Sequence, residues 1–302
     1  MSTLKLFPLM LLAVLLAACS AIPAQTPSEP GQATASVAAS ETNTPAAPTA
    51  TSVPMAFTVN GEGLSLVEFN AELARYRQSQ AELGFEISEQ DATPIVIEDL
   101  IVQVLLAQAA RESGFALDES ALQDRIDSLT AQLGSAEALA AWQLTHGYDE
   151  ASFRVALKRS VESAQMRDKI LSSVPTTAEQ VHVRQILTYN QEDAQRAKSR
   201  LDSGSDFDEL AALYDPATRG DIGWFPREYL GLKVVEDTAF ALEVNTVSDI
   251  IPSEIGFHIV KIVERDPARP LAFDVLLALQ TKALAEWVET RRAQSEITVL
   301  VK

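Results

Sequence analysis

Two glycine-containing blocks constrain the fold of this 302-residue chain more than any other feature. The first is Gly220-Asp221-Ile222-Gly223-Trp224-Phe225, and the second, further along the chain, is Gly256-Phe257-His258-Ile259-Val260. Because only glycine adopts a positive φ without a steric penalty, Gly220 and Gly223 predict a tight turn in which Ile222 points inward. Two spaced blocks are harder to match by chance than one, so they predict a defined small domain.

The elements around these blocks follow a definite order. We predict a strand over 181–188, two helices, the glycine-rich turn, a short helix ending at Leu242 and a closing strand over 257–263. This order and both blocks resemble the parvulin family of peptidyl-prolyl isomerases. The resemblance implies an isomerase domain at 176–267 with a small antiparallel sheet and surrounding helices. Rotation about an X-Pro bond involves no covalent step, so we expect no metal and no cofactor.

The resemblance also implies an apolar slot for the substrate proline. The residues that it assigns to this slot are Ile222, Leu230, Leu232, Val235 and Phe257. Relatives more often carry Met and Phe where this chain has Leu230 and Val235, which predicts a wider and less aromatic slot. Each of these residues also fits ordinary core packing, and we interpret Phe225 and Phe240 as core residues alone.

The polar side of the expected site departs from the family pattern. His258 matches a family histidine, but Gln185 stands where relatives commonly have another, in Gln185-Ile186-Leu187. In relatives, the loop that corresponds to 213–220 supplies an Asp or a Cys close to the substrate carbonyl. This loop is shorter here, and Asp215 is its candidate residue. Ser253 matches a family position at which a hydroxyl group hydrogen-bonds within the site. His182 lies an odd number of residues before Gln185, so it occupies the opposite face of the strand and is predicted to be a surface residue.

The N-terminus has the pattern of an export signal. Lys5 precedes an apolar run over 6–16 that is too short for a permanent membrane span. Leu16-Ala17-Ala18-Cys19 is similar to the bacterial lipobox, which implies a signal peptide at 1–18 and lipidation of Cys19. A secretory signal with an incidental cysteine is the alternative. Cys19 is the only cysteine, which excludes an intramolecular disulfide and a zinc site built from thiolates.

Residues 19–54 are rich in Ala, Thr, Pro and Ser and contain no aromatic residue. Such a segment buries too little apolar surface to offset its ordering entropy, so we predict a disordered tether. The formal net charge of the whole chain is −18, which argues against binding nucleic acid or adsorbing to anionic lipid. The export signal predicts an extracytoplasmic location, and the acidic charge leaves the lipid anchor as the expected membrane contact.

Residues 55–175 form a predicted helical domain that begins with a hairpin around Asn60-Gly61. Ser65 and Glu68 form a capping box, and a buried helix is expected to start at Pro94 and end at Gly114. The further helices are predicted over 118–133, 135–145 and 149–172. The hairpin and this helix order resemble the N-terminal domain of SurA-type and PrsA-type secretion chaperones.

Residues 268–302 contain a predicted helix over 272–293 and a terminal strand over 297–301, after Asp266-Pro267-Ala268-Arg269-Pro270 ends the closing strand. A lone strand needs a partner. The resemblance implies that this segment returns to the N-terminal domain, so we place the strand against Phe57-Thr58-Val59. The predicted fold is α+β: a helical chaperone lobe, made of the N-terminal segment with the C-terminal helix and strand, with the parvulin-like domain inserted.

These predictions lead to two functional hypotheses. The first is a lipid-anchored foldase that isomerises X-Pro bonds in unfolded or newly exported polypeptides. The second is a holdase chaperone with an inactive parvulin-like domain, favoured by Gln185 and the short loop. A solute-binding lipoprotein is disfavoured because the repeated βα pattern is missing. The sequence favours no particular oligomeric state and no particular client.

Overall fold

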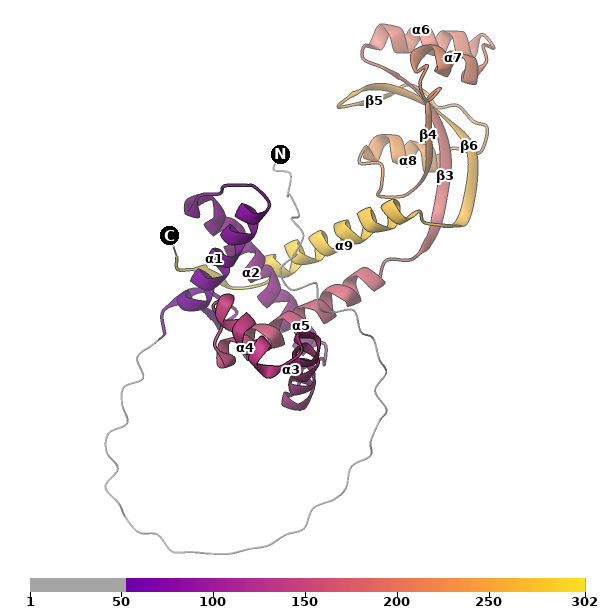
Figure 1. The fold of residues 1–302 in the computed structure, drawn as a ribbon. Coiled ribbons are helices and arrows are strands. Elements are labelled where there is room, and N and C mark those ends of the chain that lie inside the picture. Colours follow the sequence, from indigo (N-terminus) through magenta and orange to yellow (C-terminus); the bar gives the residue numbers. More distant parts are fainter. Residues whose placement is uncertain (1–52, 302) are drawn as a thin grey trace, which may run out of the picture. The chain divides into compact units, whose positions relative to one another are not determined.

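The computed structural model describes residues 53–301, in two compact units (Figure 1). Among the described residues, the first unit comprises 53–165 together with 292–301, and the second comprises Met166–Arg291. The predicted signal peptide, Cys19 and the tether up to residue 52 lie outside the described residues. The units divide inside two helices, whereas we predicted domain boundaries at 175 and 267.

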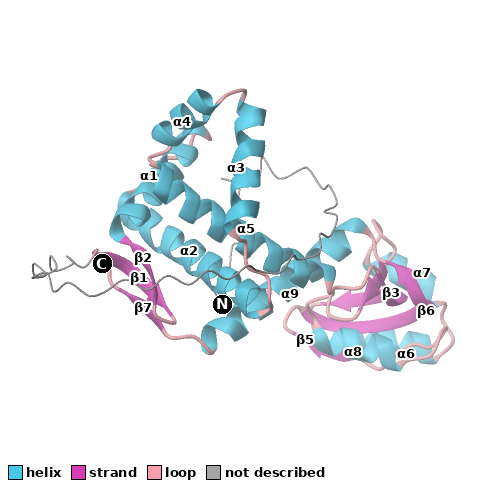
Figure 2. Cartoon of the chain, turned by 90° about the horizontal axis from the view of Figure 1, so that it is seen from below, coloured by secondary structure: helices cyan, strands magenta, loops and turns pink. Residues whose placement is uncertain are grey.

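The first unit contains a three-stranded antiparallel sheet of order β2-β1-β7 (Figure 2). Its strands are β1 Met55–Val59, β2 Glu62–Ser65 and β7 Ile297–Val299. Phe57 is opposite Val299 and Val59 is opposite Ile297, as predicted for the terminal strand. The chain that leaves this unit in a helix therefore returns to complete its sheet, which confirms the predicted place of the terminal strand. The helix before that strand, which we predicted in the same lobe, belongs to the second unit up to Arg291.

The hairpin turn forms because Asn60 and Gly61 both adopt positive φ, of 51° and 82°. Asn60 also ties the turn to the chain end, since its backbone N–H donates to the Glu296 carbonyl at 2.8 Å. In return, the Glu296 N–H donates to Asn60 Oδ1 at 2.9 Å. The turn thus fixes the point at which β7 enters the sheet.

Five helices follow the hairpin. They are α1 Leu66–Glu82, α2 Glu89–Glu112, α3 Glu119–Leu133, α4 Ala136–Thr145 and α5 Glu150–Ser172. The first four begin after Ser65, Ser88, Asp118 and Ser135, whose side chains each accept the N–H of the residue three positions on. The sequence predicted three of these caps together with the helices that they begin.

The start of α2 differs from the prediction. The helix begins at Glu89 and contains Pro94, because Ser88 Oγ accepts the Asp91 N–H at 3.1 Å and forms a cap upstream of the proline. Pro94 removes the hydrogen bond that its own N–H would have made to the fourth residue before it, and its ring crowds the carbonyl of that residue. The buried helix that follows, with Ile101, Val104 and Leu105 at 0 to 2% exposure, outweighs that loss.

Among the described helices, α2 alone has the length and composition to cross a membrane. Its most apolar stretch is 61% buried inside the protein. Phe57, Val59 and Leu64 of the hairpin and Phe69 and Leu73 of α1 pack in the same core cluster. The helix therefore behaves as a core helix, as predicted.

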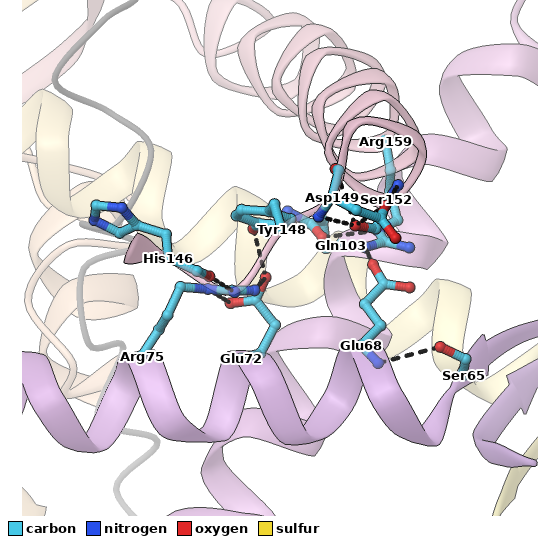
Figure 3. A network of polar contacts seen from close by, with 10 residues as sticks. All are labelled: Ser65, Glu68, Glu72, Arg75, Gln103, His146, Tyr148, Asp149, Ser152 and Arg159. Carbon is cyan, nitrogen blue, oxygen red and sulfur yellow. Dashed lines mark hydrogen bonds and ion pairs between the residues drawn. The ribbon is translucent and has the colours of Figure 1, made fainter. Parts of the chain in front are cut away.

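A network of charged residues connects α1, α2, α5 and the segment before α5 (Figure 3). Arg159 pairs with Glu68 and donates to Gln103 Oε1 at 2.9 Å. Arg75 pairs with Glu72, which accepts the Tyr148 hydroxyl at 3.1 Å. Burial, together with the nearby Glu72 carboxylate, raises the pKa of Tyr148. Because both arginines are buried, their partners are required to offset the cost of desolvation.

The second unit is built on a four-stranded antiparallel sheet of order β4-β3-β6-β5. Its strands are β3 Thr177–Thr188, β4 Asp221–Pro226, β5 Ile251–Ser253 and β6 Gly256–Pro270. Its helices are α6 Gln191–Asp202, α7 Phe207–Tyr214, α8 Lys233–Ala241 and α9 Phe273–Ala293, of which the last ends beyond the unit. The small antiparallel sheet with surrounding helices agrees with the predicted fold class.

Two cores lie on opposite faces of this sheet. On one face, α8 packs Val235 and Phe240 against Val260. On the other, α6 and α7 pack against Ile259, the neighbour of Val260 on β6. Adjacent strand residues point to opposite faces, which explains how two apolar neighbours serve two cores. Phe225 is 1% exposed and Phe240 is 5% exposed, so both are core residues as predicted.

The closing strand is longer than predicted, since β6 runs past Asp266. It continues to Pro270, which is opposite Thr177. The register shifts between the pairs Gln180↔Asp266 and Ala178↔Arg269, and Pro267 falls in this irregular stretch, where the ladder requires no N–H from it. The Gln180 side chain donates to the carbonyls of Arg269 and Pro270, at 2.9 and 3.2 Å, and holds the extension in place.

Deleting residues 297–302 tests whether the N-terminal segment and the terminal strand form one cooperative unit. We expect the free energy of unfolding of this unit to fall by about 2 kcal/mol, since Ile297 loses its burial and β1 loses a partner. The second unit should keep its unfolding transition, which hydrogen exchange resolves unit by unit. Thr298→Ala, on an exposed position of the same strand, is the control. An unchanged first unit in the deletion variant would contradict the arrangement.

Candidate active site

The glycine-rich turn is fastened to β3 through Gln185. The Gln185 N–H donates to the Gly220 carbonyl at 2.8 Å. A Cβ atom on Gly220 would lie 2.2 Å from the Gln185 carbonyl oxygen, and Gly220 has a φ of 73°. Gly223 has a φ of 75°. The turn therefore requires glycine both for its conformation and for its close approach to β3.

Three of the predicted polar residues meet around one imidazole. His258 is 1% exposed, and its Nδ1 lies 3.0 Å from Gln185 Oε1. On the other side of the ring, Nε2 lies 2.7 Å from Ser253 Oγ. We call these three residues the histidine network. They come together because β3 and β5 both pair with β6, which places Leu187 and Ile251 opposite His258.

The histidine network is uncharged at neutral pH. Burial lowers the pKa of His258 below its ordinary value of 6.5. Gln185 carries no titratable proton, whereas the histidine expected from the family would. Both ring nitrogens of His258 have hydrogen-bond partners, so the ring orientation is fixed by its neighbours.

Four of the predicted slot residues also gather. Val235 is fully buried, and Ile222, Leu230 and Leu232 are partly buried against the same core. We call these four residues the apolar cluster. His258 lies on the same strand face as Val260 of that core, so the histidine network and the apolar cluster share one side of the sheet.

Phe257 is the slot prediction that the structure places elsewhere. It is the neighbour of His258 on β6, opposite Thr188 and Pro252, and the alternation of the strand turns it to the other face. It is not a member of the core against which the apolar cluster packs.

Asp215 is at the C-terminal end of α7 and does not contact the histidine network. Its Oδ1 accepts the N–H groups of Ala217 and Thr218, each at 3.1 Å, and its Oδ2 accepts the Thr218 hydroxyl. The hydrogen bond from the Thr218 side chain, followed by the one from its backbone, lowers the pKa of Asp215. The carboxylate thus organises the turn that leads into Gly220.

His182 has a role that the sequence interpretation missed. Its Nε2 lies 2.9 Å from Asp221 Oδ1, which also accepts the Gly223 N–H at 2.8 Å, and its ring stacks on Trp224 at 5.5 Å between centroids. The side chain is 19% exposed. His182 therefore braces the glycine-rich turn and is more than a surface residue. The pairing of β3 with β4, which brings the two segments together, was the missing information.

Metal binding finds no support within residues 53–301. In this part of the chain no group of three or more His, Cys, Asp or Glu side chains is arranged to hold an ion. The described side chains of the site offer one imidazole, an amide, a hydroxyl and apolar groups.

Comparison with known proteins identifies the class of the second unit. Residues 176–275 match the PPIC-type PPIase domain, which is the parvulin class of peptidyl-prolyl isomerase. Residues 46–157 match the SurA-like N-terminal domain. The chain therefore combines a parvulin-type isomerase domain with a SurA-like N-terminal domain, as the sequence resemblance implied.

The chain is also similar to individual known proteins. The foldase protein PrsA of Geobacillus sp. (strain WCH70) is 25% identical over 236 residues, which is 75% of this chain and 80% of the relative. A parvulin-like PPIase of Rickettsia typhi is 24% identical over 245 residues, covering 74% of this chain and 81% of the relative. A crystal structure of the peptidylprolyl isomerase PrsA from Bacillus cereus aligns with a TM-score of 0.42 at 19% identity, over 76% of this chain and 82% of that one.

The lowered pKa of His258 predicts a pH dependence of stability. The unfolded chain takes up this proton near pH 6.5, whereas the folded protein does so only at lower pH. The second unit should therefore have its full stability above pH 6.5 and lose part of it as the pH falls towards the folded-state pKa. An NMR titration of the imidazoles would show His258 with a midpoint below 6.5. A midpoint above 6.5 would overturn the assignment of a neutral, buried ring.

Proposed function

We propose that the protein is an extracytoplasmic foldase, anchored through a lipid on Cys19, whose isomerase domain acts on X-Pro bonds of exported polypeptides. The observation that carries the proposal is the histidine network, located on the same side of the sheet as the apolar cluster. The printed names of the relatives, foldase PrsA and parvulin-like PPIase, support it. So do the export signal and the lipobox-like motif in the sequence.

Desolvation explains how these groups would accelerate isomerisation. The barrier of about 18 to 20 kcal/mol arises from the partial double bond of the amide. The resonance form behind that bond is dipolar, so transfer of the imide to an apolar surface disfavours it and lowers the barrier. We assign the proline ring to Ile222, Leu230, Leu232 and Val235, and we leave Phe257 out because it is on the opposite face.

The polar residues would act next to this apolar surface. Ser253 and Gln185 are partly exposed and flank the buried His258 ring, so they are the members able to reach a substrate carbonyl. His258 would orient both of them through its two ring nitrogens. Asp215 would contribute indirectly, by shaping the turn before Gly220.

A holdase chaperone with little isomerase activity is the second candidate. Two observations favour it: Gln185 replaces the histidine expected from the family, and the Asp215 carboxylate is committed to its own turn. The SurA-like domain would then bind unfolded clients without help from the isomerase site.

Leucine truncation on the isomerase domain separates these candidates. We expect Leu230→Ala to lower kcat/KM for a short X-Pro peptide about tenfold, through the loss of buried apolar contact. Leu213→Ala removes an exposed leucine of α7 and should leave the rate unchanged. A protease-coupled isomerisation assay on the full chain measures both variants. If the wild-type rate equals the uncatalysed rate while aggregation of an unfolded client is suppressed, the holdase candidate replaces the foldase.

The lipid anchor has an independent test. Cys19→Ser removes the only thiol of the chain, so it should abolish fatty-acid labelling and release the protein into the soluble extracytoplasmic fraction. Labelling with radioactive palmitate, followed by fractionation, measures both effects. Labelling that persists in the variant would contradict the anchor, whatever the isomerase activity.

A further inference from the structure

A buried carboxylate on α8 binds the loop that precedes this helix. Glu236 is 6% exposed, in a helix that otherwise contributes Val235, Ala239 and Phe240 to the core. Its Oε1 accepts the N–H of Glu228 at 2.6 Å, and its Oε2 accepts those of Tyr229 and Leu230, each at 3.2 Å. One side chain thus satisfies three successive backbone donors.

The loop conformation suits an anion at this place. Glu228 has a φ of 69° and Gly231 a φ of 73°, both in the left-handed region. Such turns direct consecutive N–H groups towards one point and form a concave site for negative charge. Glu228 adopts this conformation without being a glycine, at an energetic cost that the bonds to Glu236 offset.

The same loop positions a residue of the apolar cluster. Leu230 is the last of the three residues bound through their N–H groups, and its side chain packs against the core that contains Val235. Val235 is the helical neighbour of Glu236, so the carboxylate and a buried residue of the apolar cluster belong to the same turn of α8. The bonds to Glu236 therefore fix the main chain from which the Leu230 side chain reaches this core.

The outer side of the loop has a weaker attachment. The Glu228 carboxylate pairs with Lys282 of α9 at 3.0 Å, and the two side chains are 67% and 40% exposed. Exposed ion pairs contribute little to structure, because water screens them. The buried contact with Glu236 consequently determines the loop position.

We propose that Glu236 is a positioning residue for isomerisation, which acts by holding the main chain of residues 228–230 so that Leu230 forms one wall of the proline site. The proposal rests on the proposed function for its substrate. It concerns a residue that does not touch the substrate and that acts only through Leu230.

Glu236→Gln tests the carboxylate with the smallest change of shape. The amide NH₂ cannot accept a hydrogen bond, so at least one of the three N–H groups loses its partner. We expect the dissociation constant and KM for a short X-Pro peptide to rise about tenfold, with a smaller change in kcat. Hydrogen exchange of the segment 228–230 in the full chain should accelerate. Glu236→Asp keeps both acceptor oxygens at shorter reach and should recover part of the affinity.

A double-mutant cycle with Leu230→Ala separates positioning from general stability. If Glu236 acts through Leu230, the effect of Glu236→Gln on peptide affinity should shrink to about twofold or less in the Leu230→Ala background. Glu243→Gln, an exposed carboxylate just after α8, is the control and should change neither affinity nor exchange. If Glu236→Gln does not fold, Glu236→Asp takes its place in the cycle.

The outcomes distinguish this proposal from the proposed function. Full additivity of the two substitutions in peptide affinity, or unchanged exchange at 228–230, would overturn the positioning role. If the wild-type protein has no isomerase activity but Glu236→Gln still weakens peptide binding as expected, the positioning role is supported. In that case only the catalytic part of the proposed function is refuted.

Discussion

The pairing of β3 with β6 is the interaction on which the second unit depends. It runs from Thr177↔Pro270 to Thr188↔Phe257. The continuous part of its register places Gln185 and His258 on one face and Ile186 and Ile259 on the other. A slip of one residue would exchange these sets, removing the imidazole from its partners and burying it in the wrong core. The geometry of the site is thus a consequence of strand register.

Local signals in the sequence were sufficient for most of the architecture. The Asn60-Gly61 turn and the caps at Ser65, Asp118 and Ser135 were predictable because each depends on neighbouring residues. The partner of the last strand was predicted from the resemblance to SurA-type chaperones, since no local signal names it. The two element boundaries predicted from prolines, the start of α2 and the end of β6, were wrong. Pro94 is tolerated because burial of the helix that follows outweighs its missing hydrogen bond, and Pro267 because an irregular stretch of the ladder requires no N–H from it. Both reasons depend on the tertiary fold.

The candidate site was predictable in composition and less so in arrangement. Gln185, Ser253 and His258 meet as expected, but Asp215 serves its own turn and Phe257 faces away. The braces behind the site, His182 on Asp221 and Glu236 on the loop before α8, were missed. The sequence signal for Glu236 was an acid on an apolar helix face, but only the tertiary fold shows which N–H groups it satisfies.

The closing of the first sheet by β7 has a consequence for biogenesis. β1 is among the first described segments to leave the ribosome, yet its partner at 297–299 is among the last. The second unit is continuous in sequence and can fold while the N-terminal segment still lacks a strand. The free edge of β1 therefore stays unpaired until residues 297–299 have been synthesised, and the first unit is the last part of the described chain to be completed.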